Sequence, residues 1–293
     1  MQNLFTIHKH NILFKNFDEP VYLIPFGDIH RFAPLCHEEK WLEFLKWAAK
    51  KKNTYFIGMG DYDDLASFSE RRVLNGGNLH ESTLESLDDI YLERVIDLCK
   101  ELKFMEGKLI GLVEGNHYAQ FQSGDSTTQR MCQTLKCRYL GASAFVRLTL
   151  IRKNRCRSLD LWVHHGRGAS RMVGGSMNSV QQMIDCAEAD IYLMGHDHKK
   201  SVAMKSRLHL SEGNGAIRLS QQKILLGRTG SFLKGYEPDK QSYIAGAALS
   251  PTDLGVLKIE LTPHIQKLPK GDRLKSGAKR YLEDMYIDIH ASL

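Results

Sequence analysis

The sequence predicts an α/β fold in which two mixed sheets pack together, with helices on their outer faces. In the first half of the chain, apolar runs of strand length alternate with amphipathic stretches of helix length, an order typical of βαβ units. In the second half, strand-like segments follow one another through glycine-rich turns. With 293 residues the chain can bury a large core, and residues 1–262 are expected to form one domain.

Three strands and two helices are expected to alternate in the first half. The strands are residues 20–26, 54–59 and 108–113, each apolar and each leading to a glycine followed by Asp or Asn. Apolar side chains recur at helical spacing over residues 38–52 and 82–105. In the longer helix we expect Ser82 as the N-cap, with Glu85 completing a capping box.

The second half is expected to contain mostly strands. The strands are residues 145–153, 159–163, 191–194, 202–210, 217–226 and 256–261, and the first two pair around a basic turn at 154–157. A helix is expected over residues 176–187. Residues 263–293 are expected to form a C-terminal tail, a loop and one helix over 278–289 packed on the domain.

Composition favours a soluble cytoplasmic protein. Hydrophobic residues make up 42% and charged residues 25%, as in ordinary globular proteins, and no apolar run approaches the ~20 residues that span a bilayer. Residues 1–15 lack the apolar core of a signal peptide, and the six cysteines are scattered without a C-x-x-C pair. The net charge of +6 favours polyanionic partners but fits an ordinary basic surface equally well, and no protein-partner motif is recognisable.

Five short segments place metal-binding side chains beside a glycine. They are GDIH at 27–30, GD at 60–61, GNH at 115–117, HHG at 164–166 and GHDH at 195–198. Carboxylate and amide oxygens mixed with imidazoles suit a pair of first-row divalent ions better than a thiolate zinc site. Two such ions close together form a phosphoryl-transfer centre. The similarly spaced His8 and His10 follow neither a glycine nor an apolar run, so we interpret them as exposed surface.

Strand ends and local spacing suggest how these side chains meet. Ligands of α/β sheets gather beyond the carboxyl ends of the strands. Residues separated by one position project to the same side of an extended chain, so D-x-H and H-x-H each aim two side chains into one pocket. Asp28 and Asp61 alone bring full negative charge. Two divalent ions would leave a positive excess that matches a phosphate.

The five segments, in this order, resemble the motifs of the calcineurin-like metallophosphoesterase superfamily. The pattern D-x-H, G-D-x-x-D, G-N-H, a lone H and G-H-x-H runs from residue 28 to residue 198. The resemblance implies a four-layer α-β-β-α sandwich of two mixed sheets flanked by helices. It also implies a hydrolase that uses two metal ions and a metal-bound water or hydroxide to cleave phosphate esters.

The resemblance also implies a role for each position. The implied ligands are Asp28, His30 and His198 for the first ion; Asn116, His196 and one of His164 or His165 for the second; and Asp61 between both. We favour His164 over His165, because the family ligand commonly has one spacer before Pro or Gly. His117 is implied as the general acid or a phosphate contact, and Asp64 as a support of the site. Arg167 and Arg171 could grip a substrate phosphate, although exposed loop arginines are an equal alternative.

Departures from the family pattern narrow the activity. Tyr118 stands where the family often has an acidic residue, so the group that orients His117 is not identified. Leu65 and Glu114 replace arginines that bind monoesters in protein phosphatases, which favours diesters. Mn²⁺ is the expected ion, with Fe, Zn or Ni compatible. A DNA or RNA nuclease, a one-metal hydrolase and a non-catalytic metal-binding scaffold stay open, and the substrate class includes nucleic acids and nucleotides.

Overall fold

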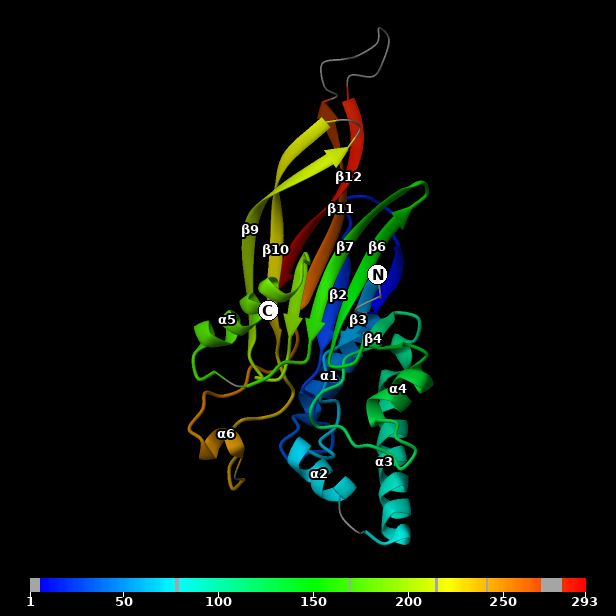
Figure 1. The fold of residues 1–293 in the computed structure, drawn as a ribbon, viewed down its shortest axis with the longest axis vertical. Coiled ribbons are helices and arrows are strands. Elements are labelled where there is room, and N and C mark those ends of the chain that lie inside the picture. Colours follow the sequence, from blue (N-terminus) through cyan, green and yellow to red (C-terminus); the bar gives the residue numbers. More distant parts are fainter. Residues whose placement is uncertain (1–5, 77–78, 169, 214–215, 241, 270–280) are drawn as a thin grey trace.

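A computed structural model of the chain describes residues 6–76, 79–168, 170–213, 216–240, 242–269 and 281–293. Within them the fold is mixed α/β, with two six-stranded sheets and six α-helices (Figure 1). In chain order the elements are β1 (Ile7–Leu13), β2 (Val21–Phe26), α1 (Glu38–Lys50), β3 (Thr54–Gly58), α2 (Phe68–Gly76), α3 (Glu81–Leu102), the short 3-10 helix η1 (Lys103–Met105), β4 (Leu109–Leu112), α4 (Thr127–Leu135), β5 (Arg138–Tyr139), β6 (Ser143–Arg152), β7 (Arg155–His164), α5 (Val173–Cys186), β8 (Ile191–Met194), β9 (Lys200–Gly213), β10 (Ala216–Thr229), α6 (Tyr243–Gly246), β11 (Lys258–Pro269) and β12 (Tyr281–Ser292).

Both sheets contain parallel and antiparallel pairs. Sheet 1 has the order β1-β6-β7-β8-β10-β9, with β6–β7 and β9–β10 antiparallel and the other pairs parallel. Sheet 2 has the order β12-β11-β2-β3-β4-β5 and is parallel from β2 to β5. The helices α1, α3 and α4 connect these parallel strands, as parallel crossovers require.

The two sheets face each other across a shared apolar core. Leu23 and Ile57 of sheet 2 and Leu161 and Leu193 of sheet 1 belong to this one buried cluster. In the second half of β7, Leu159, Leu161 and Val163 enter it, because successive side chains of a strand point to opposite faces. The core therefore fixes which face of β7 is turned inward.

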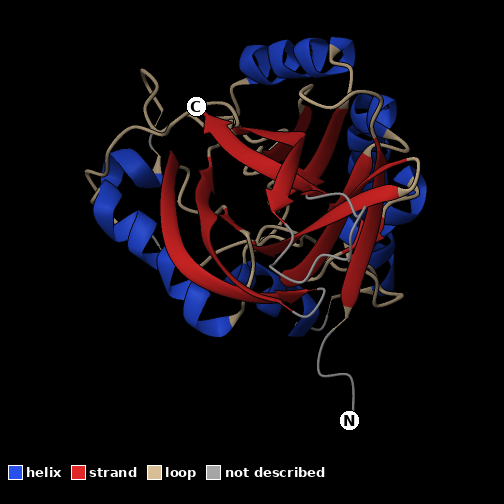
Figure 2. Ribbon diagram, turned by 90° about the horizontal axis from the view of Figure 1, so that it is seen from above, coloured by secondary structure: helices blue, strands red, loops and turns tan. Residues whose placement is uncertain are grey.

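Helices cover the outer faces of both sheets (Figure 2). Trp41 and Phe44 of α1 pack with Phe26 and Phe56 on sheet 2, together with residues of α3 and α4. On sheet 1, Val180 of α5 packs in a separate cluster with residues of β8 and β10. Among the described helices, none combines the length and apolar character needed to cross a membrane.

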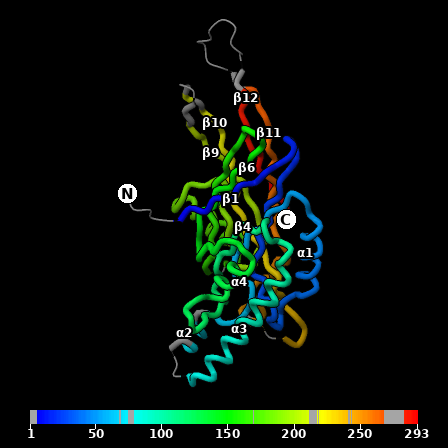
Figure 3. The backbone as a smooth tube through the Cα atoms, turned by 90° about the vertical axis from the view of Figure 1, so that its right-hand side faces the viewer, coloured from blue at the N-terminus to red at the C-terminus, as the bar shows by residue number. Residues whose placement is uncertain are grey.

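Two long hairpins extend from the body of the molecule. The β9–β10 and β11–β12 hairpins project on the side opposite to α2 and α3, as Figures 1 and 3 both show. The strand ends that carry the sequence motifs lie at the other end of the sheets. The motifs and the described outer ends of these hairpin strands are thus separated along the long axis of the molecule.

Most sequence-based elements are confirmed with small shifts at their ends. The strand expected at 191–194 is β8 with the same bounds, and the helix expected at 38–52 is α1. The expected cap of the long helix is wrong. Helix α3 begins at Glu81 and its N-cap is His80, whose Nδ1 accepts a hydrogen bond from Ser82 N at 3.3 Å. His8 and His10 are half-buried on β1 rather than exposed.

The helix expected over residues 278–289 is also wrong. Residues 278–280 lie outside the described part, and from Tyr281 the chain is strand β12, paired antiparallel with β11. Met285 and Ile289 are buried in the core between the sheets, and Ile287 packs against it. Met285, Ile287 and Ile289 stand at every second position, which is typical of a strand with one buried face. The partner strand β11 also runs further than expected, to Pro269.

Candidate metal centre

The five ligand-bearing segments converge at the carboxyl ends of five strands. Asp28 follows β2, Asp61 follows β3 and Asn116 follows β4 in sheet 2, while His165 follows β7 and His196 follows β8 in sheet 1. The chain segments after β2 and β3 stay paired beyond the sheet, through hydrogen bonds such as Asp28 N to Gly60 O at 2.9 Å. The site therefore sits where the open ends of both sheets meet.

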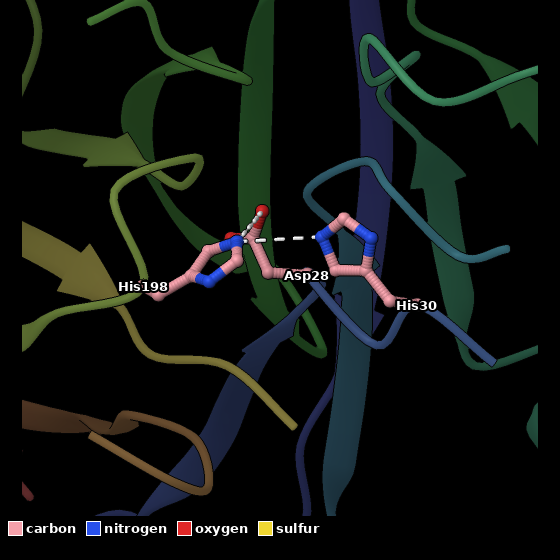
Figure 4. A group of neighbouring side chains, drawn as sticks. All are labelled: Asp28, His30 and His198. Atoms are coloured by element: carbon pink, nitrogen blue, oxygen red, sulfur yellow. Dashed lines mark hydrogen bonds and ion pairs between the residues drawn. The ribbon is translucent and has the colours of Figure 1, made fainter. Parts of the chain in front are cut away.

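One group of ligands consists of Asp28, His30 and His198 (Figure 4). His30 Nε2 lies 3.3 Å from His198 Nε2, and His198 Nε2 lies 3.7 Å from Asp28 Oδ1. The three side chains point toward one another from two separate loops, and one potential donor atom of each lies within 4.8 Å of the others. Two imidazole nitrogens and one carboxylate oxygen at this spacing could hold one divalent ion.

A second group consists of Asp61, His165 and His196, and Asn116 joins it. The Asn116 Oδ1 atom lies 2.9 Å from His165 Nε2 and 2.8 Å from His196 Nδ1, and these two nitrogens are 3.3 Å apart. His165 Nδ1 donates to Met59 O at 2.7 Å, which turns Nε2 toward the group. This set could hold a second ion.

Asp61 lies between the two groups. Its Oδ2 atom is 3.3 Å from His165 Nε2 in one group and 3.8 Å from His30 Nε2 in the other. Its Oδ1 atom accepts hydrogen bonds from Asn116 N at 2.7 Å and His117 N at 2.9 Å. Both carboxylate oxygens are thus engaged, and one carboxylate faces both ligand groups.

The structure brings His165, not the favoured His164, into the ligand group. Leu159, Leu161 and Val163 of β7 face the core between the sheets, and the next residue in that phase is His165. His164 lies on the opposite face, where its Nδ1 accepts from Gly166 N at 2.8 Å. The preference for His164 was therefore wrong, and the alternation of apolar residues along β7 contained the signal that could have corrected it.

The sequence pattern was interpreted as an extended backbone in the candidate ligand segments. The structure does not have an extended backbone there. Five ligands have positive φ: Asp28 at 46°, His30 at 47°, Asp61 at 49°, His196 at 74° and His198 at 57°. This left-handed region costs about 1–3 kcal/mol per non-glycine residue and is enriched at functional sites. The D-x-H and H-x-H pairs converge because of these left-handed residues, which spacing alone does not reveal.

Two of the glycines are required for space. A Cβ on Gly195 would lie 2.8 Å from Asp28 Oδ2, and a Cβ on Gly115 would collide with the Asp61 carboxylate. Gly60 is needed for its backbone, with φ of 101° in the turn before Asp61. The glycines at 60, 115 and 195 thus admit a carboxylate or a sharp turn.

His117 and Asp64 form a pair at the edge of the site. His117 Nδ1 lies 2.6 Å from Asp64 Oδ1, and the same oxygen lies 3.4 Å from His30 Nδ1. Hydrogen bonds from these two imidazoles hold the pKa of Asp64 well below its ordinary value. Asp64 is therefore the group that orients His117, a role for which the sequence offered no candidate.

Burial and neighbouring charges shift the titration of the carboxylates. Burial is the main cause that raises the pKa of Asp28 to about 7. Burial alone would also raise the pKa of Asp61, but the charge of His165 and its hydrogen bond to Asp61 outweigh it and lower that pKa. Asp28 Oδ1 is buried and accepts no hydrogen bond from the described residues. An orphaned buried carboxylate oxygen fits a cation.

Burial and neighbouring charges shift the pKa values of His165, His196 and His198 in different directions. Burial would lower the pKa of His165, but the Asp61 charge and hydrogen bond raise it to about 9. Burial and the charge of His165 lower the pKa of His196 to about 4, and burial with His30 lowers that of His198. Protons on His165 thus offset the negative charge of Asp61, and metal ions would replace them.

Two buried arginines that the sequence reasoning missed hold the ligand loops. Arg228 is 1% exposed and donates to Gly195 O at 2.7 Å, and its Nε lies 3.5 Å from Asp197 Oδ2. Arg71 donates to Asn116 O and Tyr118 O, each at 2.8 Å, and stacks on the Tyr118 ring. Neither lies next to a motif in the sequence, so no local signal marks them.

A cleft of about 520 Å³ opens onto the site, a volume typical of small-molecule sites. His30, Asp61, His117, His196 and His198 form its floor. Arg167, which was expected to contact a substrate phosphate, is exposed and does not line the cleft. Arg171 does line the cleft. Arg171 and Lys199, rather than Arg167, are therefore in a position to contact a phosphate bound in the cleft.

No protein-family model matches the chain, and no curated protein sequence matches it.

Proposed function

We propose that this protein is a calcineurin-like metallophosphoesterase that uses two divalent ions to hydrolyse phosphate esters. The observation that carries the proposal is the pair of ligand groups that face the single carboxylate of Asp61. The four-layer α-β-β-α sandwich belongs to the same proposal, and the shared core between the sheets and the helices outside them support it. A cytoplasmic location is supported by six free cysteines.

The ligand sets divide between the two ions. Asp28, His30 and His198 would hold one ion. Asn116, His165 and His196 would hold the other, with Asp61 shared. When bound, such ions polarise phosphoryl oxygens and lower the pKa of a coordinated water toward 7. Mn²⁺ suits this mixture of oxygen and nitrogen ligands, and Fe, Zn or Ni are compatible with it.

His117 is proposed to protonate the leaving oxygen. Its Nδ1 atom is occupied by Asp64, so Nε2 is the nitrogen that delivers the proton. The contact with the Asp64 carboxylate fixes the plane of the ring. The pair thus acts as an oriented general acid beside the ligand groups.

Diesters are proposed as better substrates than monoesters. A monoester carries one more negative charge, which protein phosphatases meet with arginines at the positions of Leu65 and Glu114. Here Leu65 packs against the apolar cluster around α1 and α3, and Glu114 accepts a hydrogen bond from Tyr139 at 2.8 Å. Neither residue offers a cation for the extra charge.

The test is hydrolysis of bis-p-nitrophenyl phosphate by the Mn²⁺-loaded protein. We expect turnover that EDTA abolishes, and two equivalents of metal by elemental analysis. On a dialkyl phosphodiester, whose alkoxide leaving group needs a proton, His117→Ala should lower kcat by about 10²–10⁴-fold with unchanged metal content. His209→Ala, an exposed histidine of β9, is the matched control. Unchanged turnover of the dialkyl ester in His117→Ala would refute the acid role, and one equivalent of metal would favour a one-metal hydrolase.

A non-catalytic scaffold predicts metal binding without turnover of any ester. Monoesters, diesters, cyclic nucleotides and single- and double-stranded DNA should therefore be compared with the same preparation. Monoester activity above diester activity would overturn the conclusion drawn from Leu65 and Glu114.

A further inference from the structure

The cleft extends well beyond the ligand groups and ends against an apolar wall. Leu233, Ile244, Leu249 and Pro251 line this part of the cleft, and all four come from the segment between β10 and β11. The first three are half-buried and Pro251 is exposed. Apolar side chains left partly exposed inside a cleft mark a binding surface for an apolar group.

The wall is a built structure that is attached to the candidate metal centre. Thr252 Oγ1 donates to Leu233 O at 2.6 Å, and Tyr236 OH donates to Leu249 O at 2.6 Å, so the segment folds back on itself. Asp253 N donates to His198 O at 3.0 Å. This bond ties the segment that forms the wall to the loop that carries the candidate ligand His198.

Cations line the cleft between the wall and the ligand groups. Arg171, Lys199 and Lys234 all lie along it. Outside the metal-ligand and His117–Asp64 groups, the acidic residue in the lining is Asp197, whose carboxylate is 1% exposed and is held by Ser176 and Arg228. Lys234 pairs with Glu237 at 3.4 Å, so Arg171 and Lys199 supply the positive charge of the cleft, which complements an anionic ligand.

We propose, on the basis of the function proposed above, that this wall binds the retained substituent of a small phosphodiester and that the substituent is a large group with an apolar face, for which a nucleoside serves as the probe. The wall is attached at His198, whereas His117 pairs with Asp64 on the far side of His30. The leaving oxygen belongs near His117. The group that stays on phosphorus then extends along the cations to Leu249 and Ile244.

The experiment compares two esters that share one leaving group. Thymidine 5′-(p-nitrophenyl phosphate) and methyl p-nitrophenyl phosphate both release p-nitrophenolate and differ in the retained substituent. For the Mn²⁺-loaded protein we expect kcat/KM to be at least about tenfold higher for the thymidine ester. Leu249→Ala and Ile244→Ala should each remove most of that preference and change methyl-ester hydrolysis by less than about twofold.

A binding measurement and a control variant complete the design. Calorimetry should show that Leu249→Ala weakens thymidine 5′-monophosphate binding by about tenfold while inorganic phosphate binding is unchanged. Leu208→Ala, at an exposed leucine of the β9–β10 hairpin, should behave as the parent protein in every assay.

The outcomes separate this inference from the proposed function. Equal kcat/KM for the two esters in an active parent protein would overturn the inference and keep the phosphoesterase. Equal losses on both esters in Leu249→Ala would also overturn it, because the wall would then support the centre alone. If neither ester is hydrolysed, the phosphoesterase fails, and calorimetry still decides the wall. Preferred cleavage of an oligonucleotide, unaffected by Leu249→Ala, would identify a polynucleotide substrate instead.

Discussion

Replacement of Arg228 by Met should destabilise the protein and loosen the candidate metal centre. Arg228 is 1% exposed, donates to Gly195 O at 2.7 Å and to Ser176 O at 2.9 Å, and lies beside the Asp197 carboxylate, which is also 1% exposed. The methionine would leave that carboxylate buried without its cation. Removing one partner of a buried ion pair costs about 3–5 kcal/mol.

The loss of stability in Arg228→Met should be visible as a lower melting temperature. For a chain of this size about 3–5 kcal/mol corresponds to a Tm lower by roughly 5–8 °C. Urea denaturation of the metal-free protein measures the free energy directly. Arg147→Met is the matched control, because Arg147 pairs with Asp160 at 2.7 Å on the surface and should cost no more than about 1 kcal/mol.

The same variant should bind metal more weakly. Arg228 holds the carbonyl of Gly195, which directly precedes His196, so a loosened loop should cost about 10–100-fold in Mn²⁺ affinity. Combining Arg228→Met with Asp197→Asn should recover part of the stability, because the uncompensated charge is then removed. Our interpretation fails if Arg228→Met unfolds within about 1 kcal/mol of the parent and binds Mn²⁺ normally.

Three further predictions concern the ligand choice, the proton balance and the thiols. His165→Ala should bind one equivalent of metal by elemental analysis and His164→Ala two, because only His165 lies in the ligand group; the reverse result would restore the sequence-based preference. The raised pKa values of Asp28 (about 7) and His165 (about 9) mean that both carry protons which metal must displace. Mn²⁺ affinity should therefore rise from pH 6 to pH 9 with release of about one to two protons at pH 7, measured by calorimetry in two buffers, and a pH-independent affinity would contradict it. Burial raises the pKa of the Cys36 thiol to about 11, so at pH 8 iodoacetamide should label it more slowly than the exposed Cys156 by mass spectrometry, and equal labelling would show that Cys36 is not shielded.

Local pattern was sufficient for the elements that connect the motifs. Apolar runs predicted β2, β3, β4 and β8, and helical periodicity predicted α1 and α3. These predictions succeeded because the side chains that each element buries are close together in the sequence. The motifs around Asp28, Asp61, Asn116 and His196 also identified side chains that the structure brings together.

The C-terminal hairpin shows where local pattern was insufficient. Residues 281–292 form a strand because β11 offers an edge and the core offers room for Met285 and Ile289. The pairing of β12 depends on β11, and β11 itself lies beside β2 from the start of the chain. The strand therefore cannot be predicted from its own residues. Short apolar segments are ambiguous until their partners are known.

The sequence by itself determined the chemistry of the candidate site, since residue type decides which atoms can ligate an ion and the motif order decides which strand ends carry them. The tertiary structure decided the geometry. It imposed left-handed backbone at five candidate ligands, turned Asp64 toward His117 and supplied Arg228 from a distant segment. These choices depend on packing between residues far apart in the chain, which no local window contains.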